Sequence, residues 1–418
     1  MFKKVTLDNN IPVLMEPARE VRSVCIGIWV KVGSRDESPE KNGISHFLEH
    51  MFFKGTKSRS AEGIAMEIDS LGGELNAFTS AEYTVFYVKV LDEYMVKGVE
   101  LLADIFVNST FPAEDLEREK SVVNDEINMV EDTPSDYVHD LFNKNIWGET
   151  GLGQSVLGKR ETLNALTRDD LLAHIDKNYG AEDIVIACSG NIRENELVAY
   201  LNDTLGRIKK RGVQRILLPP EYNSGLDIVT KELSETHICL GLKGMQYNSE
   251  ERYALHLLNT VLGSGFSSRL FQHVREKRGL VYSIYSYHVS YFDAGVWSVY
   301  AGADRKNANE VIDITINEMR NLSRSITSEE LYRAKAQLKG NLVLALESTS
   351  NKMTNIAKQE IYYGKYFSPA EIIKMVEAIT LEEVKDLSKR LIEDKPFALT
   401  IYGAVKEDDL KEACKLLK

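Results

Sequence analysis

One internal repeat limits what this chain can fold into more than any other feature of its sequence. The segment that begins at Glu114 aligns with the segment that begins at Glu329, an offset of 215 residues, and Glu, Leu, Arg and Lys coincide between the two. Thr167 falls on Thr380 at the similar offset of 213 residues. A similar offset over separate segments is typical of a duplicated domain. The sequence therefore predicts two similar domains of about 210 residues each.

The pattern within each half predicts an α+β fold. Short apolar or alternating segments rich in β-branched residues indicate strands, and longer amphipathic segments indicate helices. We expect each homologous domain to be a mostly antiparallel sheet with helices packed on one face. The stretch 212–225 holds consecutive prolines and no strong period, so it is the predicted linker between domains at 1–211 and 226–418.

The segments behind this prediction are distributed over both halves. Strands are predicted at 21–31, 74–90 (one long strand, or two with a break near Ser80), 183–189, 236–243 and 397–402, and the stretch 281–301 is strand-rich. Helices are predicted from near Asn42 to Ser45 onward, and at 61–71, 92–108, 113–131, 168–179, 250–262, 305–323, 328–348 and 369–391.

Composition narrows the classes of function. The chain has 418 residues, of which 43% are hydrophobic and 27% charged, as in ordinary globular proteins. The formal net charge of −12 argues against nucleic-acid binding as a main role. No apolar run approaches the roughly 18 residues of a membrane span, and no signal or transit peptide is recognisable. We therefore expect a cytoplasmic protein without a membrane partner.

The four cysteines also indicate a cytoplasmic protein. Cys25, Cys188 and Cys239 each lie in an apolar run, and Cys414 is far from all three, so no C-x-x-C pair exists. We expect buried free thiols in a reducing compartment.

The motif that carries chemistry is His46-Phe47-Leu48-Glu49-His50. In a helix, His46 and His50 lie on one face and can share a Zn²⁺ ion at about 2.0–2.1 Å. Glu49 overlooks the same point and is suited to take a proton from a zinc-bound water. The pattern H-x-x-E-H is the inverse of the H-E-x-x-H metalloprotease motif. A surface helix with two solvated histidines is the alternative.

A zinc ion held by two histidines needs a third protein ligand. Glu119 and Glu126 are seven residues apart, so both lie on one face of the helix predicted at 113–131. Asp125 and Glu131 are alternatives on spacing alone. The repeat supplies a comparison, because the second copy lacks every one of the proposed site residues. The positions of Glu119, Glu126, His46, Glu49 and His50 are taken there by Ala334, Asn341, Ala254, Leu257 and Leu258.

With these residues in view, the sequence resembles the pitrilysin-like zinc peptidases, which include insulin-degrading enzyme and the subunits of the mitochondrial processing peptidase. The resemblance is carried by the stretch from His46 to Thr56, the segment from Leu75 to Ser80, and Glu126, which follows His50 by 76 residues. It covers essentially the whole chain and is closest to the short bacterial homodimeric members. It implies a zinc-dependent endopeptidase that cleaves extended peptides or unfolded segments inside a closed chamber.

The resemblance also implies roles for single residues. It makes His46, His50 and Glu126 the ligands of one Zn²⁺ per chain and Glu49 the general base. Glu119 becomes a supporting acid near the metal that orients a ligand histidine.

Substrate binding is the remaining expectation. The resemblance points to Arg275 and Tyr282 as residues that hold the scissile region, and we expect the strand with Asn76 and Ala77 to be an edge that pairs with an extended peptide. The expected partners are peptide substrates and a second copy of the chain. The rival hypotheses are a non-catalytic or chaperone-like subunit of a hetero-oligomeric peptidase, and a metal-binding protein without peptidase activity.

Overall fold

The computed structural model describes residues 1–149, 151–212, 217, 219–406 and 410, and the chain divides into two compact units. The first unit comprises Met1–Met129, Gln154–Leu217 and Ala345–Tyr366, and the second comprises Val130–Gly153, Leu218–Leu344 and Phe367–Lys418. Residues 213–216 and 218 of the predicted linker, and Cys414, lie outside the described residues. The predicted domain limits describe the sequence repeat and stay a prediction.

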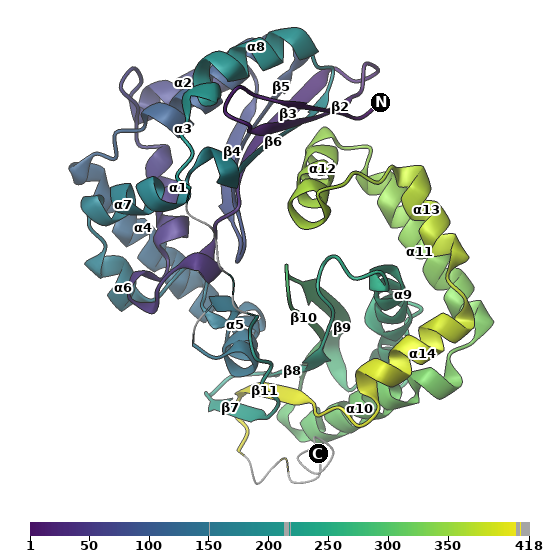
Figure 1. The fold of residues 1–418 in the computed structure, drawn as a ribbon. Helices are drawn as coiled ribbons and strands as arrows, with labels where there is room; N and C mark the ends of the chain where they lie inside the picture. The colour runs from purple at the N-terminus through teal and green to yellow at the C-terminus, as the bar shows by residue number, and fades with distance from the viewer. Residues whose placement is uncertain (150, 213–216, 218, 407–409, 411–418) are drawn as a thin grey trace. The chain divides into compact units, whose positions relative to one another are not determined.

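The first unit is built on a six-stranded sheet (Figure 1). Its order is β1 (Lys3–Thr6), β2 (Pro12–Pro17), β6 (Ile184–Gly190), β3 (Ser23–Val30), β5 (Thr84–Leu91) and β4 (Glu74–Thr79). β2 and β6 are parallel, and the other neighbours are antiparallel. The unit also holds α1 (Ile44–Phe52), α2 (Ala61–Ser70), α3 (Met95–Asn108), α4 (Ala113–Glu131), α6 (Arg160–Ala165), α7 (Arg168–Asn178), α8 (Glu194–Thr204) and α12 (Thr349–Tyr363).

The second unit repeats this topology. Its sheet runs β7 (Leu226–Thr230), β11 (Ala398–Gly403), β8 (Thr236–Lys243), β10 (Gly295–Ala303) and β9 (Val281–Ser290). The order and the strand directions match β2-β6-β3-β5-β4, including one parallel pair at the same place. The helices are α5 (Pro134–Trp147), α9 (Arg252–Gly263), α10 (Ala308–Ser325), α11 (Ser328–Ala345), α13 (Pro369–Ala378) and α14 (Leu381–Ile392). The predicted α+β fold with two similar, mostly antiparallel sheets is confirmed.

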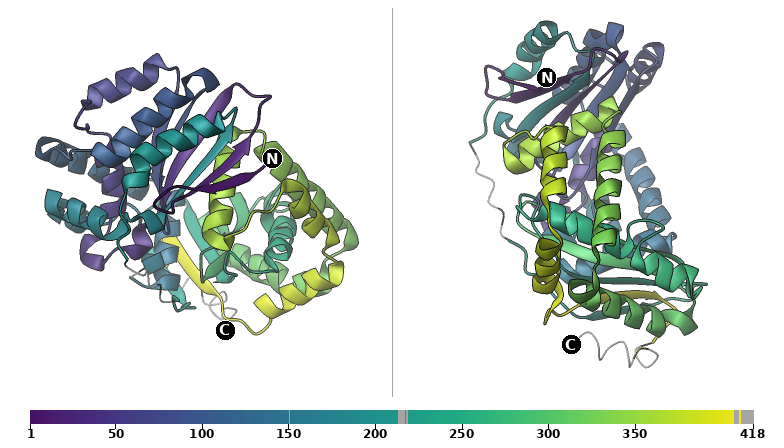
Figure 2. Two further views of the ribbon diagram at one scale, coloured as in Figure 1. Left: turned by 45° about the horizontal axis from the view of Figure 1, so that its top comes forward. Right: turned by 90° about the vertical axis from the view of Figure 1, so that its right-hand side faces the viewer.

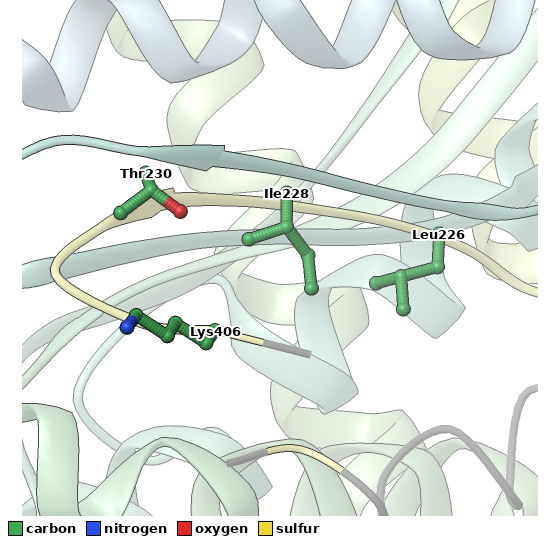
Figure 3. Close-up of a pocket in the computed structure, with 4 residues that line it drawn as sticks. All are labelled: Leu226, Ile228, Thr230 and Lys406. Atoms are coloured by element: carbon green, nitrogen blue, oxygen red, sulfur yellow. The ribbon is translucent and has the colours of Figure 1, made fainter. Parts of the chain in front are cut away.

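The two sheets differ at one edge. In the first sheet β1 pairs with β2 and forms the edge. The second sheet has no such additional strand among the described residues, so β7 is its edge. A cavity of about 400 Å³ lies along β7 (Figure 3), and it is lined by Leu226, Ile228, Thr230 and Lys406.

Each sheet is covered on its second face by a helix from the other half of the chain. Residues Ile26 and Ile28 of β3 face the apolar core, so Gly27 between them faces the opposite side, where α12 packs. A Cβ atom on Gly27 would lie 2.7 Å from the Sδ atom of Met353, so any larger residue there would require the Met353 side chain to shift. In the second sheet, a Cβ atom on Gly241 of β8 would lie 2.8 Å from the Phe142 ring of α5. We call α5 and α12 the exchanged helices, because each packs on the sheet formed by the other half of the chain. They form a helical layer in addition to the helices that were predicted on one face of each sheet (Figure 2).

Most predicted elements appear close to their expected limits. The stretch 74–90 forms two strands, β4 and β5, with a turn between them. The single helix predicted at 369–391 is wrong, because the structure has two helices, α13 and α14, separated near Thr380. Thr380 caps α14, since its hydroxyl accepts from the backbone N–H of Glu383 at 3.2 Å and its own N–H donates to the Glu383 carboxylate at 2.6 Å.

Two further expectations concern the chain as a whole. Cys25, Cys188 and Cys239 are buried free thiols, as predicted. Within the described ranges, no helix is both long enough and apolar enough to span a bilayer.

Candidate metal centre

Helix α1, which carries the H-x-x-E-H motif, begins in an unexpected way. The helix was predicted to begin between Asn42 and Ser45, whose side chains are of the kind that cap helices, but Gly43 occupies the N-cap position with a φ of 96°. The buried carboxylate of Glu37 accepts hydrogen bonds from the backbone N–H groups of Gly43 at 2.7 Å and Ser45 at 2.8 Å. Burial raises the pKa of Glu37 to about 7, against the effect of these N–H donors. The carboxylate of Glu37, six residues before the N-cap residue, thus takes the place of a side-chain cap from the N-cap residue itself.

The three proposed ligands meet. Nitrogen atoms of His46 and His50 and a carboxylate oxygen of Glu126 all lie within 4.8 Å of one another. The Nε2 atoms of His46 and His50 are each 3.5 Å from Oε2 of Glu126. In the part of the chain that the structure describes, His46, His50 and Glu126 form the group of metal-binding side chains with such spacing. Neither Asp125 nor Glu131 belongs to this group.

The donor atoms fit a cation. Among the described residues, Oε2 of Glu126 and Nδ1 of His46 are buried without a hydrogen-bond partner. A buried acceptor without a partner is costly, and a cation between Glu126 and the two imidazoles would satisfy it. Burial lowers the pKa of His46 to about 3, and neutral imidazole is the form that binds metals. Two histidines and one carboxylate, with a position left for water, form a catalytic zinc set.

Glu119 lies behind the ligands, as expected of a supporting acid. Its Oε2 atom is 3.2 Å from Nδ1 of His50, and its Oε1 atom is 2.6 Å from Nζ of Lys54. When His50 donates from Nδ1 to this carboxylate, its Nε2 keeps a lone pair directed at the metal position.

Glu49 is held by a residue for which no separate role was predicted. The hydroxyl of Thr79, at the end of β4, donates to Oε2 of Glu49 at 2.7 Å. Burial raises the pKa of Glu49, and the Thr79 hydrogen bond works in the opposite direction. The only local signal was a threonine at the end of a predicted strand.

β4 also carries the two predicted peptide-binding positions. It is an edge strand of the first sheet, because its ladder partner among the described residues is β5. Asn76 is exposed and Ala77 is buried. The Asn76 side chain accepts from the N–H of Ala77 at 2.8 Å.

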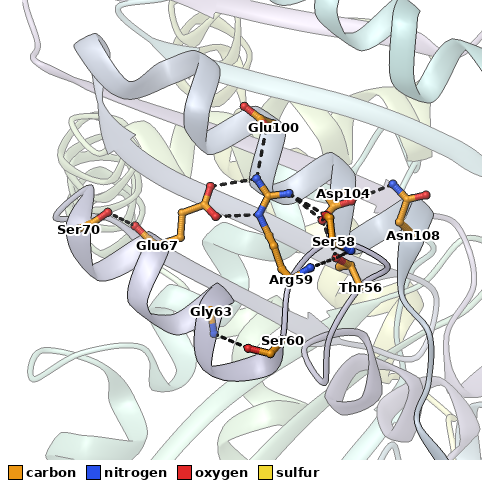
Figure 4. Close-up of polar contacts among 10 residues, drawn as sticks. All are labelled: Thr56, Ser58, Arg59, Ser60, Gly63, Glu67, Ser70, Glu100, Asp104 and Asn108. Atoms are coloured by element: carbon orange, nitrogen blue, oxygen red, sulfur yellow. Dashed lines mark hydrogen bonds and ion pairs between the residues drawn. The ribbon is translucent and has the colours of Figure 1, made fainter.

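An ion-pair network fixes the segment that follows α1 (Figure 4). Arg59 bonds Glu67 of α2 at 2.7 Å and Asp104 of α3 at 2.8 Å. The Thr56 hydroxyl donates to the same Asp104 carboxylate at 2.7 Å. The end of α1 is thereby tied to two neighbouring helices.

The remaining predicted site residues belong to the second unit. The guanidinium of Arg275 lies 4.9 Å from the centre of the Phe271 ring. Tyr282, on β9, is 79% exposed. Their role at the metal position stays a prediction.

Comparisons with known proteins show which proteins the chain resembles. The sequence profile of the Insulinase (Peptidase family M16) family matches residues 13–160, and that of the Peptidase M16 inactive domain matches residues 165–338. The uncharacterized zinc protease YmxG of Bacillus subtilis is 43% identical over 96% of this chain and 98% of its own length. An uncharacterized zinc protease of Streptomyces coelicolor is 36% identical over 99% of this chain and 91% of its own length.

Solved structures share the fold. A peptidase M16 inactive domain structure from Pseudomonas fluorescens superposes with a TM-score of 0.90 at 20% identity, covering 97% of this chain and 98% of that one. A protease from Helicobacter pylori superposes with a TM-score of 0.88 at 21% identity, covering 96% and 99%.

Proposed function

The chain belongs to the M16 (insulinase) family of peptidases, and on that premise we propose that it is a zinc-dependent endopeptidase that binds one Zn²⁺ per chain. The observation that carries the proposal is the meeting of His46, His50 and Glu126 beside Glu49. The buried, unpartnered oxygen of Glu126 supports a cation at this point.

His46, His50 and Glu126 hold the metal. When bound, zinc supplies Lewis-acid polarisation of the scissile carbonyl and lowers the pKa of a bound water toward about 7. Glu119 orients His50 by accepting the proton of Nδ1.

Glu49 moves the proton. Its carboxylate takes a proton from the attacking water and later delivers it to the leaving amine. Thr79 holds one oxygen of this carboxylate, which keeps the other directed at the water.

The substrate is an extended peptide or unfolded segment. The free edge of β4, at Asn76 and Ala77, offers main-chain hydrogen bonds that give affinity with little sequence preference. Arg275 and Tyr282 hold the scissile region from a second subunit, so the cytoplasmic enzyme works as a homodimer around a closed chamber.

Metal analysis combined with cleavage of a peptide library tests this proposal. Wild-type protein prepared without chelator is expected to hold about one Zn²⁺ per chain, and His50→Ala to lose it. His256→Ala, on the corresponding helix α9 of the second unit, is the matched control and keeps the zinc. Full zinc content in both His46→Ala and His50→Ala would overturn the ligand assignment.

Glu49→Gln separates the base from the ligands. This variant is expected to keep the zinc and to lose about 10²–10⁴-fold in activity, because the amide cannot accept the proton. Near-normal turnover in the zinc-loaded variant contradicts the proposed role. Wild-type protein that holds zinc but cleaves nothing, even as a dimer, favours the non-catalytic alternative.

A further inference from the structure

Lys54 contacts Glu119, the acid beside the proposed zinc ligands, but has no role in the proposal above. It follows His50 by four residues, just beyond the end of α1, and its backbone N–H donates to the carbonyl of Met51 at 3.2 Å. Its Nζ atom is 2.6 Å from Oε1 of Glu119, and the side chains of Lys54 and Glu119 are only 27% and 9% exposed. Exposed lysine pairs contribute little, but this pair is largely shielded from water.

The two oxygens of Glu119 have separate partners. Oε1 meets Lys54, while Oε2 lies 3.2 Å from Nδ1 of His50. A carboxylate is rigid and planar, so fixing one oxygen restricts where the other points. Without Lys54, the buried Glu119 would lack its cationic partner and could rotate away from His50.

The backbone around Lys54 is held firmly enough to set this geometry. The N–H of Thr56 donates to the carbonyl of Arg59 at 2.8 Å, and that of Thr110 donates to the carbonyl of Gly55 at 3.1 Å. The Arg59 network in Figure 4 ties the same segment to α2 and α3. The ammonium group is therefore presented from a fixed segment rather than from a free loop.

We propose that Lys54 is a positioning residue for the metal centre: it holds Glu119 so that Glu119 keeps His50 in the tautomer and orientation that bind zinc. This inference rests on the proposed zinc binding, but not on peptidase activity. Loss of an outer partner of a metal-ligating histidine typically lowers metal affinity about 10–100-fold.

Zinc affinity, measured by competition with a chromogenic chelator, tests the assignment. Lys54→Met removes the ammonium group while keeping the length of the side chain, and is expected to bind zinc about 10–100-fold more weakly. Lys54→Arg restores a cation and is expected to recover most of the affinity. Lys57→Met removes the same charge from an exposed position three residues further on, and should bind zinc like wild type.

A double-mutant cycle separates positioning from general damage to the fold. If Lys54 acts through Glu119, adding Lys54→Met to Glu119→Gln causes little further loss of zinc affinity. Thermal unfolding of the metal-free variants identifies any variant that does not fold, and Lys54→Gln then replaces Lys54→Met.

The outcomes are distinct. Zinc affinity unchanged in Lys54→Met, or losses that simply add in the double variant, would overturn the role of Lys54. Wild-type protein that binds zinc but does not cleave peptides would refute the proposed function and leave the Lys54 result standing. Wild-type protein that binds no zinc would overturn both.

Discussion

A single hydroxyl group, that of Thr79, holds the carboxylate that is proposed as the general base. It donates to Glu49 at 2.7 Å from the edge strand β4, so it couples the position of the base to the strand proposed to bind the peptide. A hydrogen bond to a charged group contributes about 1.5–3 kcal/mol. We expect Thr79→Val, which keeps the shape and removes the donor, to lower kcat about 10–100-fold with zinc content unchanged.

Thr79→Ser is the matched control for this prediction, because it keeps the hydroxyl group and should retain most of the activity. Steady-state kinetics on a fluorogenic peptide, with zinc measured on the same samples, provides the comparison. Equal kcat values for Thr79→Val and wild type would show that Glu49 needs no such support.

The site residues also show what a sequence can and cannot reveal. His46, Glu49 and His50 are neighbours on one helix, so their spacing alone predicts a shared face. Spacing alone left Asp125 and Glu131 open as the third ligand, and only the family resemblance pointed to Glu126, whose carboxylate the structure places within 4.8 Å of the ligand nitrogens of both histidines. The contacts of Thr79 and Lys54 join segments far apart in the chain, and no local pattern predicts them.

At the scale of elements, the start of α1 depends on a carboxyl group outside the helix. Burial raises the pKa of Glu37 from about 4.5 to about 7 in the folded protein. Between these values the folded state binds more protons than the unfolded state, so the contribution of Glu37 to the free energy of unfolding falls as pH rises from about 4.5 to about 7.

Urea unfolding of metal-free protein at several pH values checks this sign. We expect the stability advantage of wild type over Glu37→Gln to be larger near pH 5 than near pH 7.5, since glutamine does not titrate. Glu40→Gln, at a nearby exposed position, is the control. An advantage that grows with pH would mean that the N–H donors of Gly43 and Ser45 outweigh burial and keep Glu37 ionised.

Some helices can be predicted from neighbouring residues, whereas others depend on residues far away in the chain. The break between α13 and α14 has a local signal, the pair Thr380 and Glu383, which forms a capping box. The exchanged helices α5 and α12 were not predicted, because what stabilises them is the second face of a sheet formed by other parts of the chain. The strands predicted at 21–31, 183–189, 236–243 and 397–402 have strong apolar patterns and lie close to their observed limits, whereas 281–301 forms two strands, β9 and β10, and the edge strand β7 was not predicted.

At the scale of the whole molecule, the two units have the same topology but different chemistry. α1 carries two of the three proposed metal ligands and the proposed base, whereas α9 carries the buried apolar residues Ala254, Leu257 and Leu258 at the corresponding positions. A homodimer in which the second unit of one chain serves the metal centre of its partner would contain two complete, shared sites.

Mixing two inactive chains tests this arrangement. One chain carries Glu49→Gln, and the other carries Arg275→Ala with Tyr282→Phe. In the heterodimer one site carries both lesions and the other carries neither, so activity is expected to return to about half of wild type per heterodimer. Mass spectrometry of tagged chains verifies subunit exchange. If chains exchange and no activity returns, the sites are not shared in this way.

The exchange of α12 also has a consequence for the order in which the protein is made. The first sheet buries Trp29 against Met353, with the indole N–H 3.1 Å from the sulfur atom. Residues Ala345–Tyr366 belong to the first unit, although they follow most of the second. During translation the first sheet therefore exposes an apolar face until this late segment leaves the ribosome. We therefore expect the first half of the chain to be prone to aggregation until α12 has been made, and a chain that stops before α12 to leave that face uncovered.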